Sequence, residues 1–126
     1  MDTLEAILDT QIDDVEYWER LYNMQPASVT VTRTAPSDFQ QRQLIVYLDD
    51  ERIGDLMFGQ AISRDLTPGP HRLRVSNTLV WKTVKFDAKP GEQVRFEAIN
   101  RAGKLTYPML LIMGAGPLYV TLRRVS

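Results

Sequence analysis

His71 is the only histidine of the chain, and the chain has no cysteine. Histidine-based catalysis needs partners at fixed positions, and a zinc site needs several His or Cys ligands. No such pattern occurs here, so we expect His71 to make a structural hydrogen bond within a strand. We assign no catalytic, cofactor-binding or metal-ligating residue, and we expect a protein that is not an enzyme and uses no cofactor.

A cluster of acidic residues lies in the middle of the chain and consists of Asp49, Asp50, Glu51 and Asp55. Hard cations such as Ca²⁺ take several oxygen ligands, so a weak surface calcium site is one interpretation. The spacing matches no EF-hand loop, and polar turns are often acidic because they are solvated. We favour a polar turn, and cation binding at these four residues stays open.

Basic residues are expected on one outward sheet face, close to Trp81: Arg72, Arg74, Lys82, Lys85 and Arg95. Bases interleaved with an aromatic residue are typical of proteins that bind single-stranded nucleic acid. The net charge of −1, however, differs from the strongly basic balance of such domains. We therefore expect no nucleic-acid partner and interpret these bases as a solvated face.

For two further groups of residues we weigh a binding role against a structural one and favour the structural one. Trp81, Tyr47, Tyr107 and Tyr119 are candidates for a platform on which sugars stack, although most aromatic residues of a sandwich form core or cross-strand pairs. Residues 114–116, Gly-Ala-Gly, lack the Lys-Ser/Thr ending of a phosphate loop. We predict that these three residues form a turn into the last strand.

The elements that position these residues begin with an acidic N-terminal unit, residues 1–24. Residues 1–20 contain seven acids and one base, and the rest of the chain contains nine acids and 14 bases. Spacings of four and three predict an amphipathic helix over residues 3–22 with this stripe: Leu4, Leu8, Gln11, Val15, Trp18 and Tyr22. We expect this helix to dock on the basic body of the protein rather than pair with itself, and a swapped homodimer stays open.

After Pro26 the period of the apolar residues changes to two, which is typical of β-strands. Strands are predicted over residues 27–34, 43–48, 52–58, 61–66, 71–76, 81–87, 92–99 and 118–125. Turn signals separate them, of which Pro68-Gly69 is the strongest. The predicted fold is mostly β, an antiparallel β-sandwich of the Ig-like or PEGA-like kind over residues 27–126, preceded by one amphipathic α-helix. Its core is expected to contain Leu44, Val46, Leu73, Val75, Val94 and Phe96.

The segment 105–113 fits either a buried strand or a short helix. Pro108 disfavours a central strand and suits the first position of a helix, with Gly114 beyond its end, so we favour the helix. We expect its apolar side chains to cover an open end or edge of the sandwich. The alternative is an exposed patch that contacts a partner or a membrane surface.

Residues 44–99 resemble a PEGA domain, a small β-sandwich module of bacterial proteins. Residues 46–54, Val-Tyr-Leu-Asp-Asp-Glu-Arg-Ile-Gly, correspond to the hairpin of that family, with Asp50 at its usual turn glycine. Residues 66–75, Leu-Thr-Pro-Gly-Pro-His-Arg-Leu-Arg-Val, correspond to its Pro-Gly turn and following strand. The resemblance implies a non-enzymatic accessory or interaction module and carries over no site residues.

The sequence has no membrane-span signal, since no apolar run approaches about 18 residues. The N-terminus lacks the basic-then-apolar order of a signal peptide, so a cytoplasmic location is expected. We expect an interaction or accessory module that binds another protein or a second copy of itself. The alternative is a β-sandwich that binds a small ligand or a carbohydrate in a groove lined by Trp81 or by residues 105–113.

Overall fold

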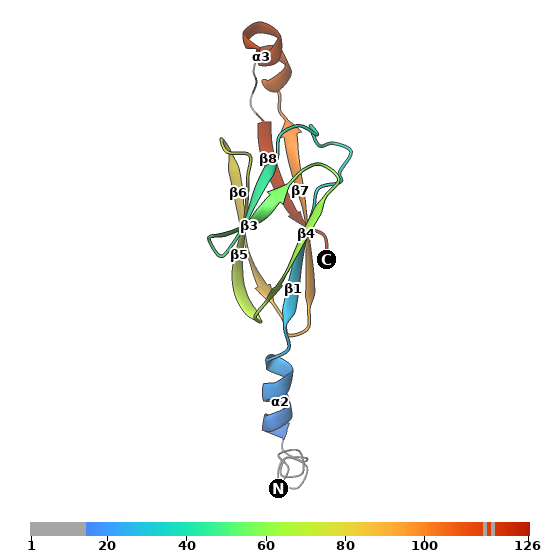
Figure 1. Ribbon diagram of the computed structural model, residues 1–126, viewed down its shortest axis with the longest axis vertical. Helices are drawn as coiled ribbons and strands as arrows, with labels where there is room; N and C mark the ends of the chain where they lie inside the picture. Colours follow the sequence, from blue (N-terminus) through green and yellow to red (C-terminus); the bar gives the residue numbers. More distant parts are fainter. Residues whose placement is uncertain (1–14, 115, 117) are drawn as a thin grey trace.

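The computed structural model describes residues 15–114, 116 and 118–126. The described elements are α2 (Val15–Asn23), β1 (Ala27–Thr32), β2 (Leu44–Leu48), β3 (Glu51–Leu56), β4 (Ala61–Leu66), β5 (Gly69–Ser76), β6 (Trp81–Ala88), β7 (Gln93–Ala102), α3 (Thr106–Met113) and β8 (Leu118–Arg124). The strands form two facing sheets, ordered β4-β1-β7-β8 and β3-β2-β5-β6 (Figure 1). The predicted β-sandwich with a helix before it is confirmed.

The core lies between the two sheets and follows from the alternation of apolar residues along the strands. All six residues predicted for it are fully buried: Leu44, Val46, Leu73, Val75, Val94 and Phe96. The rings of Phe86 in β6 and Phe96 in β7 meet edge to face with centroids 5.2 Å apart. Because β6 and β7 belong to different sheets, this aromatic contact joins the two layers.

One strand pair differs from the predicted antiparallel arrangement. β1 lies in the middle of its sheet, where it pairs antiparallel with β4 and parallel with β7, with Ser28 opposite Gln93. Alternation specifies which side chains face inward but not the direction of the neighbouring strand. A parallel pair needs a long crossover, and here the chain from β2 to β6, including the whole second sheet, supplies it.

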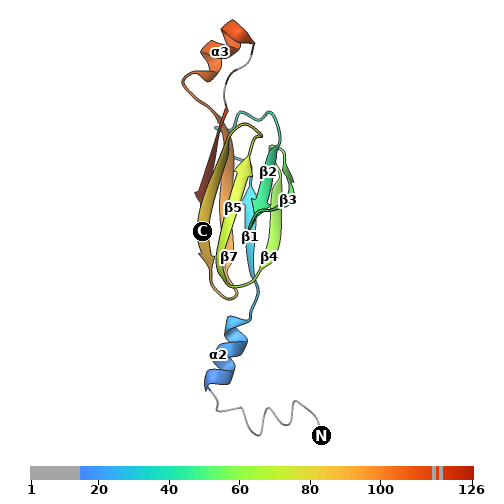
Figure 2. The same cartoon turned by 90° about the vertical axis from the view of Figure 1, so that its left-hand side faces the viewer.

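The described part of the N-terminal helix does not dock on the sandwich. α2 projects away from the sheets in both side views (Figures 1 and 2), and none of its residues is buried. Val15, Trp18 and Tyr22 of the predicted stripe are exposed. The docking prediction is therefore wrong for these residues, because Pro26 and the start of β1 direct the chain into the sheet while α2 continues outward. Leu4, Leu8 and Gln11 lie outside the described residues.

The strands run between two ends of the molecule that differ in composition. We call the end that carries helix α3 the α3 end; it comprises the loops 33–43, 57–60 and 77–80 and, as a fourth loop, the described residues of the connection from β7 through α3 to β8. The opposite ends of the same strands, on the side of α2, form the α2 end, with turns at 49–50, 67–68 and 89–92. Helix α3 is thus an insertion between β7 and β8 that extends beyond the sheets.

We predict that Phe96→Ala lowers the free energy of unfolding by about 3–5 kcal/mol, because it opens a cavity between the sheets. Urea unfolding monitored by circular dichroism measures the change. The control is Leu111→Ala in α3, where the side chain is 89 % exposed and a change within about 0.5 kcal/mol is expected. A loss below about 1 kcal/mol for Phe96→Ala contradicts its central position.

Candidate functional site

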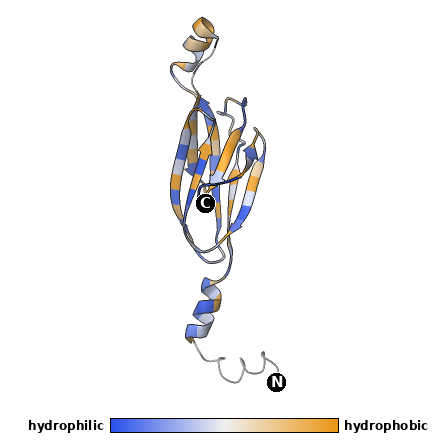
Figure 3. Cartoon of the chain, turned by 60° about the vertical axis from the view of Figure 1, so that its left-hand side comes forward, coloured by the Kyte–Doolittle hydropathy of each residue, from blue (hydrophilic) through white to orange (hydrophobic). Residues whose placement is uncertain are grey.

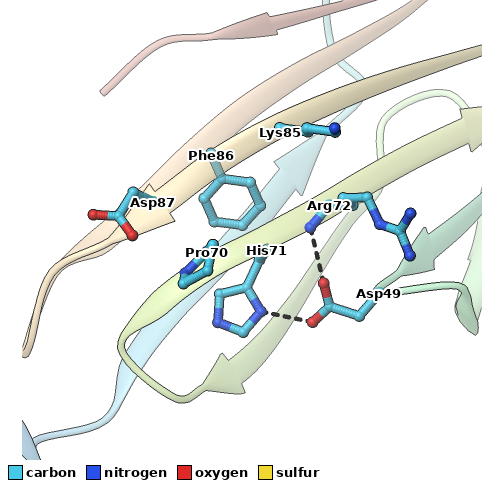
Figure 4. Close-up of a pocket in the computed structure, with 7 residues that line it drawn as sticks. All are labelled: Asp49, Pro70, His71, Arg72, Lys85, Phe86 and Asp87. Carbon is cyan, nitrogen blue, oxygen red and sulfur yellow. Dashed lines mark hydrogen bonds and ion pairs between the residues drawn. The ribbon is translucent and has the colours of Figure 1, made fainter.

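His71 joins the hairpin turn between β2 and β3 to strand β5 (Figure 4). Its Nδ1 lies 2.6 Å from Oδ2 of Asp49, and its Nε2 lies 2.6 Å from the carbonyl oxygen of Thr67. The second oxygen of Asp49 accepts a hydrogen bond from the backbone N–H of Arg72 at 2.8 Å. Both ring nitrogens face acceptors, and the doubly protonated ring is the form that donates to both. The predicted hydrogen-bonded place of His71 in a strand is confirmed.

The surroundings of His71 favour its charged form. Burial of the ring disfavours the charge, but the hydrogen bonds to Asp49 and Thr67 outweigh it and raise the pKa of His71 above its usual value. Burial likewise disfavours the charged Asp49 carboxylate, and its hydrogen bonds with His71 and the Arg72 backbone outweigh that effect and lower the pKa of Asp49. The two opposite shifts therefore widen the pH range over which His71 and Asp49 form an ion pair.

A hollow of about 540 Å³ lies beside this ion pair and is also lined by Pro70, Lys85 and Phe86. Its volume falls within the range of small-molecule sites. The imidazole and the carboxylate, however, hold each other, and Phe86 packs on the His71 ring with centroids 5.8 Å apart. These side chains therefore fasten a turn to a strand, and the hollow gives the ligand-binding alternative little support.

The acidic cluster is divided among basic partners. Asp49 and Asp50 have φ of 50° and 69°, the left-handed pair that a tight two-residue hairpin requires. Asp50 forms an ion pair with Arg72, and Asp55 forms one with Arg52 at 2.6 Å. Across the residues that the structure describes, no group of three or more His, Cys, Asp or Glu side chains is arranged to hold a metal ion.

The expected basic face is only partly assembled. Arg72 lies opposite Lys85 in the β5–β6 pair, so the two share the outer face of their sheet. Lys82 lies opposite buried Val75 and thus on the other side of β6, and Arg95 belongs to the other sheet. The prediction that these bases share one face is wrong for Lys82 and Arg95. Lys82 lies at a strand position whose side chain is on the opposite face of the sheet from that of Arg72, and Arg95 lies in the other sheet.

The aromatic platform is also divided. Tyr47 and Trp81 line a hollow of about 240 Å³ together with Arg74, whose guanidinium stacks on the Tyr47 ring at 4.4 Å. Tyr107 instead belongs to α3, where its ring lies near Phe39, and Tyr119 belongs to β8 of the other sheet. The hollow is smaller than the usual range of small-molecule sites, about 300–1,000 Å³.

Helix α3 is the predicted helix of residues 105–113, and Gly114 ends it with a φ of 74°. Pro108 lies within its first turn rather than at its first position, which is Thr106. Met109 and Leu110 are half-buried, but the tip of the helix does not cover the sandwich, since Leu111 and Ile112 are 89 % and 82 % exposed. The covering role is therefore wrong, because the insertion extends beyond the strand ends. Among the described helices, none is long and apolar enough to cross a membrane.

The base of α3 is closely fitted to the sandwich by two glycines. A Cβ at Gly103 would lie 2.3 Å from the ring of Tyr119, and one at Gly116 would lie 2.2 Å from the Thr106 carbonyl oxygen. Thr106 is fully buried, and its Oγ1 accepts a hydrogen bond from the backbone N–H of Gly103 at 2.8 Å. Thus Gly116 allows the close return of the chain to β8, and Gly114 provides the helix end.

A buried ion pair that sequence reasoning missed organises the loops at the α3 end. The guanidinium of Arg33 is fully buried and donates to both carboxylate oxygens of Asp38, at 3.0 and 3.1 Å. It also donates to the backbone carbonyls of Arg42, Leu56 and Gln41 at 2.6 to 3.0 Å. All five N–H groups of the guanidinium are thereby satisfied. Burial raises the pKa of Asp38, but its bonds to Arg33 and backbone amides outweigh this and lower it.

Two buried asparagines extend this polar network toward α3. The backbone N–H of Asn100 in β7 donates to Asp38 at 3.0 Å. Its side-chain oxygen accepts a hydrogen bond from Nδ2 of Asn77, which also donates to the carbonyl of Leu118 at 2.9 Å. The network therefore connects the loops 33–43 and 77–80 with both strands that flank α3. It fixes the position from which the exposed helix extends.

The fold and this site describe a β-sandwich whose exposed apolar helix extends from a base of buried polar side chains that are hydrogen-bonded to one another. Comparison with protein-family models found no match to the chain. Comparisons with curated proteins and with solved structures found none either. The PEGA-like resemblance of residues 44–99 stays a prediction.

The ion pair of His71 predicts a pH dependence of stability. A raised folded-state pKa adds stability that is fully present below the unfolded pKa of about 6.5 and is lost as pH rises through the folded value. The free energy of unfolding should therefore fall as pH rises from the unfolded pKa of about 6.5 through the folded pKa in the native protein, and change less in His71→Gln. Urea unfolding across this range measures it. Because His71 is the only histidine, equal slopes in both proteins contradict the assignment.

Removing the buried countercharge of Arg33 should be costly. Asp38→Asn leaves a buried guanidinium unneutralised, and we expect a loss of about 3–5 kcal/mol in the free energy of unfolding. The matched control is Glu97→Gln, which removes a more exposed ion pair to Arg123 and should cost about 0–1 kcal/mol. Denaturant unfolding measures both variants, and equal losses would show that burial of the Arg33 pair has no special effect.

Proposed function

We propose that this protein is a non-enzymatic interaction module whose contact element is helix α3. The observation that carries the proposal is an uncharged, mostly apolar eight-residue helix with Leu111 and Ile112 almost fully exposed. Large exposed apolar surfaces are unfavourable in water unless another surface covers them. A helix held in this position is therefore suited to contact a second surface.

The structure around α3 supports a contact role rather than a role in folding. None of the apolar side chains of α3 belongs to the core cluster between the sheets, and Leu111, Ile112 and Met113 are exposed. The base of the helix is nevertheless closely fitted, through Thr106 and the glycines on either side. A fixed base with a free apolar tip lowers the entropic cost of binding, because the element is already ordered.

The side chains that could act as acids, bases or charge stabilisers in catalysis are engaged in hydrogen bonds and ion pairs within the fold. This favours a non-enzymatic function. His71 and Asp49 pair with each other, and Arg33 uses every donor in a buried network. The resemblance of residues 44–99 to PEGA domains implies an accessory or interaction module as well. A small-ligand or carbohydrate site is the weaker candidate, since the Tyr47–Trp81 hollow measures only about 240 Å³ and the charged groups of the 540 Å³ hollow, His71 and Asp49, pair with each other.

The proposal predicts that α3 contacts another molecule in the cell. A photoreactive phenylalanine analogue is placed at Ile112 of the full chain, and a control chain carries it at Lys89, in a turn at the α2 end. Irradiation of intact cells that express the protein should give a discrete covalent adduct from position 112 and none from position 89. Equal labelling at both positions, or none at position 112, rejects α3 as the contact element.

A further inference from the structure

The arrangement of apolar residues on α3 indicates a partner that surrounds the helix. A helix that binds a protein groove presents one apolar face, with anchors spaced by three or four residues and polar residues elsewhere. Between Tyr107 and Met113, α3 has no charged residue, and its apolar side chains lie on every side. Figure 3 shows α3 as a mostly hydrophobic element beyond strands that alternate between hydrophobic and hydrophilic residues. A helix that is apolar on all sides is stable where apolar groups surround it, as in the hydrocarbon of a lipid bilayer.

The exposed apolar residues of the sandwich gather at the α3 end. Apart from α2 and its linker, the large apolar side chains that the described residues expose are Met57, Leu79, Trp81, Leu105, Tyr107, Leu111, Ile112, Met113, Tyr119 and Val125. All of these except Val125 belong to α3, to its flanking segments, or to loops and strand starts at the same end. The apolar surface therefore extends from the helix to the neighbouring loop 77–80.

The charges at the α3 end are basic. Within the described residues of its four loops, Asp38 is the only acid, and it is neutralised by Arg33 in the buried network. Arg42 and Lys104 in these loops are exposed, as is Arg101 near the end of β7. Lys104 lies two residues before the first residue of α3. The apolar helix is thus flanked by exposed cations.

The α2 end carries charges of both signs. Its turns and the adjoining strand ends hold Asp49, Asp50, Asp65, Asp87 and Glu92, and three of these acids pair with bases: Asp49 with His71, Asp50 with Arg72 and Glu92 with Arg124. Helix α2 adds Glu16, Glu19 and Arg20 on the same side of the molecule (Figure 1). Because the exposed charges within the described loops of the α3 end are all basic, an anionic surface attracts that end of the molecule.

We propose that the protein binds the surface of an anionic lipid bilayer by inserting α3 into the interfacial region. This inference rests on the proposed function and names the partner of the same element. An eight-residue helix is about 12 Å long, close to the depth of about 5–10 Å that interfacial elements reach. Tyr107 and Tyr119 have the amphipathic rings typical of the headgroup level, and Lys104 and Arg101 are positioned near lipid phosphates.

The test measures binding of the full chain to vesicles by co-sedimentation. The chain should bind vesicles of phosphatidylcholine with about 30 % phosphatidylglycerol, and bind less to phosphatidylcholine alone. Leu111→Ser combined with Ile112→Ser should weaken binding at least tenfold while leaving the melting temperature unchanged, since both side chains are exposed. Lys104→Gln should weaken binding to the anionic vesicles about fivefold. The matched control Lys89→Gln, at the α2 end, should have no effect.

A fluorescence reporter tests the orientation. The two native tryptophans, Trp18 and Trp81, are replaced by Phe, and a single tryptophan is placed at Ile112 or, as the control, at Lys89. On addition of the anionic vesicles, emission from position 112 should shift to shorter wavelength and be quenched by brominated lipid. Emission from position 89 should not change. A shift at position 89 alone contradicts the proposed orientation.

The outcomes separate this inference from the proposed function. No vesicle binding, or binding that survives the double serine variant, overturns the lipid inference. If position 112 then crosslinks to a protein, or the native chain forms a dimer that the serine variant abolishes, α3 is still the contact element and only the lipid assignment fails. If position 112 also gives no adduct in cells, both proposals fail together.

Discussion

The buried guanidinium of Arg33 is the contact on which the α3 end of the structure depends. A fully buried charge is costly unless a countercharge and hydrogen bonds satisfy it, and Asp38 with three backbone carbonyls does so here. These partners lie in loop 33–43 and at the end of β3, and Asp38 also accepts a bond from Asn100 in β7. A single side chain thus joins both sheets and fixes a long irregular loop. Helix α3 extends from a base that this network makes rigid.

Alternation along the strands was sufficient to predict the two layers and their core. It also contained a signal for the network, because Arg33 continues the inward series of Val29 and Val31, and Asn100 continues that of Phe96 and Ala98. A polar residue at an inward position needs a buried partner. Asp38 could not be identified as that partner, since it belongs to an irregular loop whose path no periodicity encodes.

The helix at residues 106–113 shows a second limit of sequence reasoning. Its composition and the flanking proline and glycine predicted the element, yet an apolar helix can either cover a core or be exposed. The direction of the chain at Gly103 and Gly116 decides between these, and both depend on close contacts with Tyr119 and Thr106. The basic character of the α3 end likewise emerged only in the structure, because Arg42, Arg101 and Lys104 are far apart or isolated in the sequence and the strands bring them to one end.

The parallel pairing of β1 with β7 has a consequence for the order in which the chain folds. Sheet β3-β2-β5-β6 comes from one continuous stretch of the chain apart from β4, so its contacts are mostly local. Strand β1, by contrast, pairs on one side with β7, whose residues lie about 65 positions away, as in the hydrogen bond of Thr32 with Phe96, 64 positions apart. Distant contacts close large loops and form late. During synthesis on the ribosome, β1 therefore remains without its β7 partner until residues 93–102 have also left the exit tunnel.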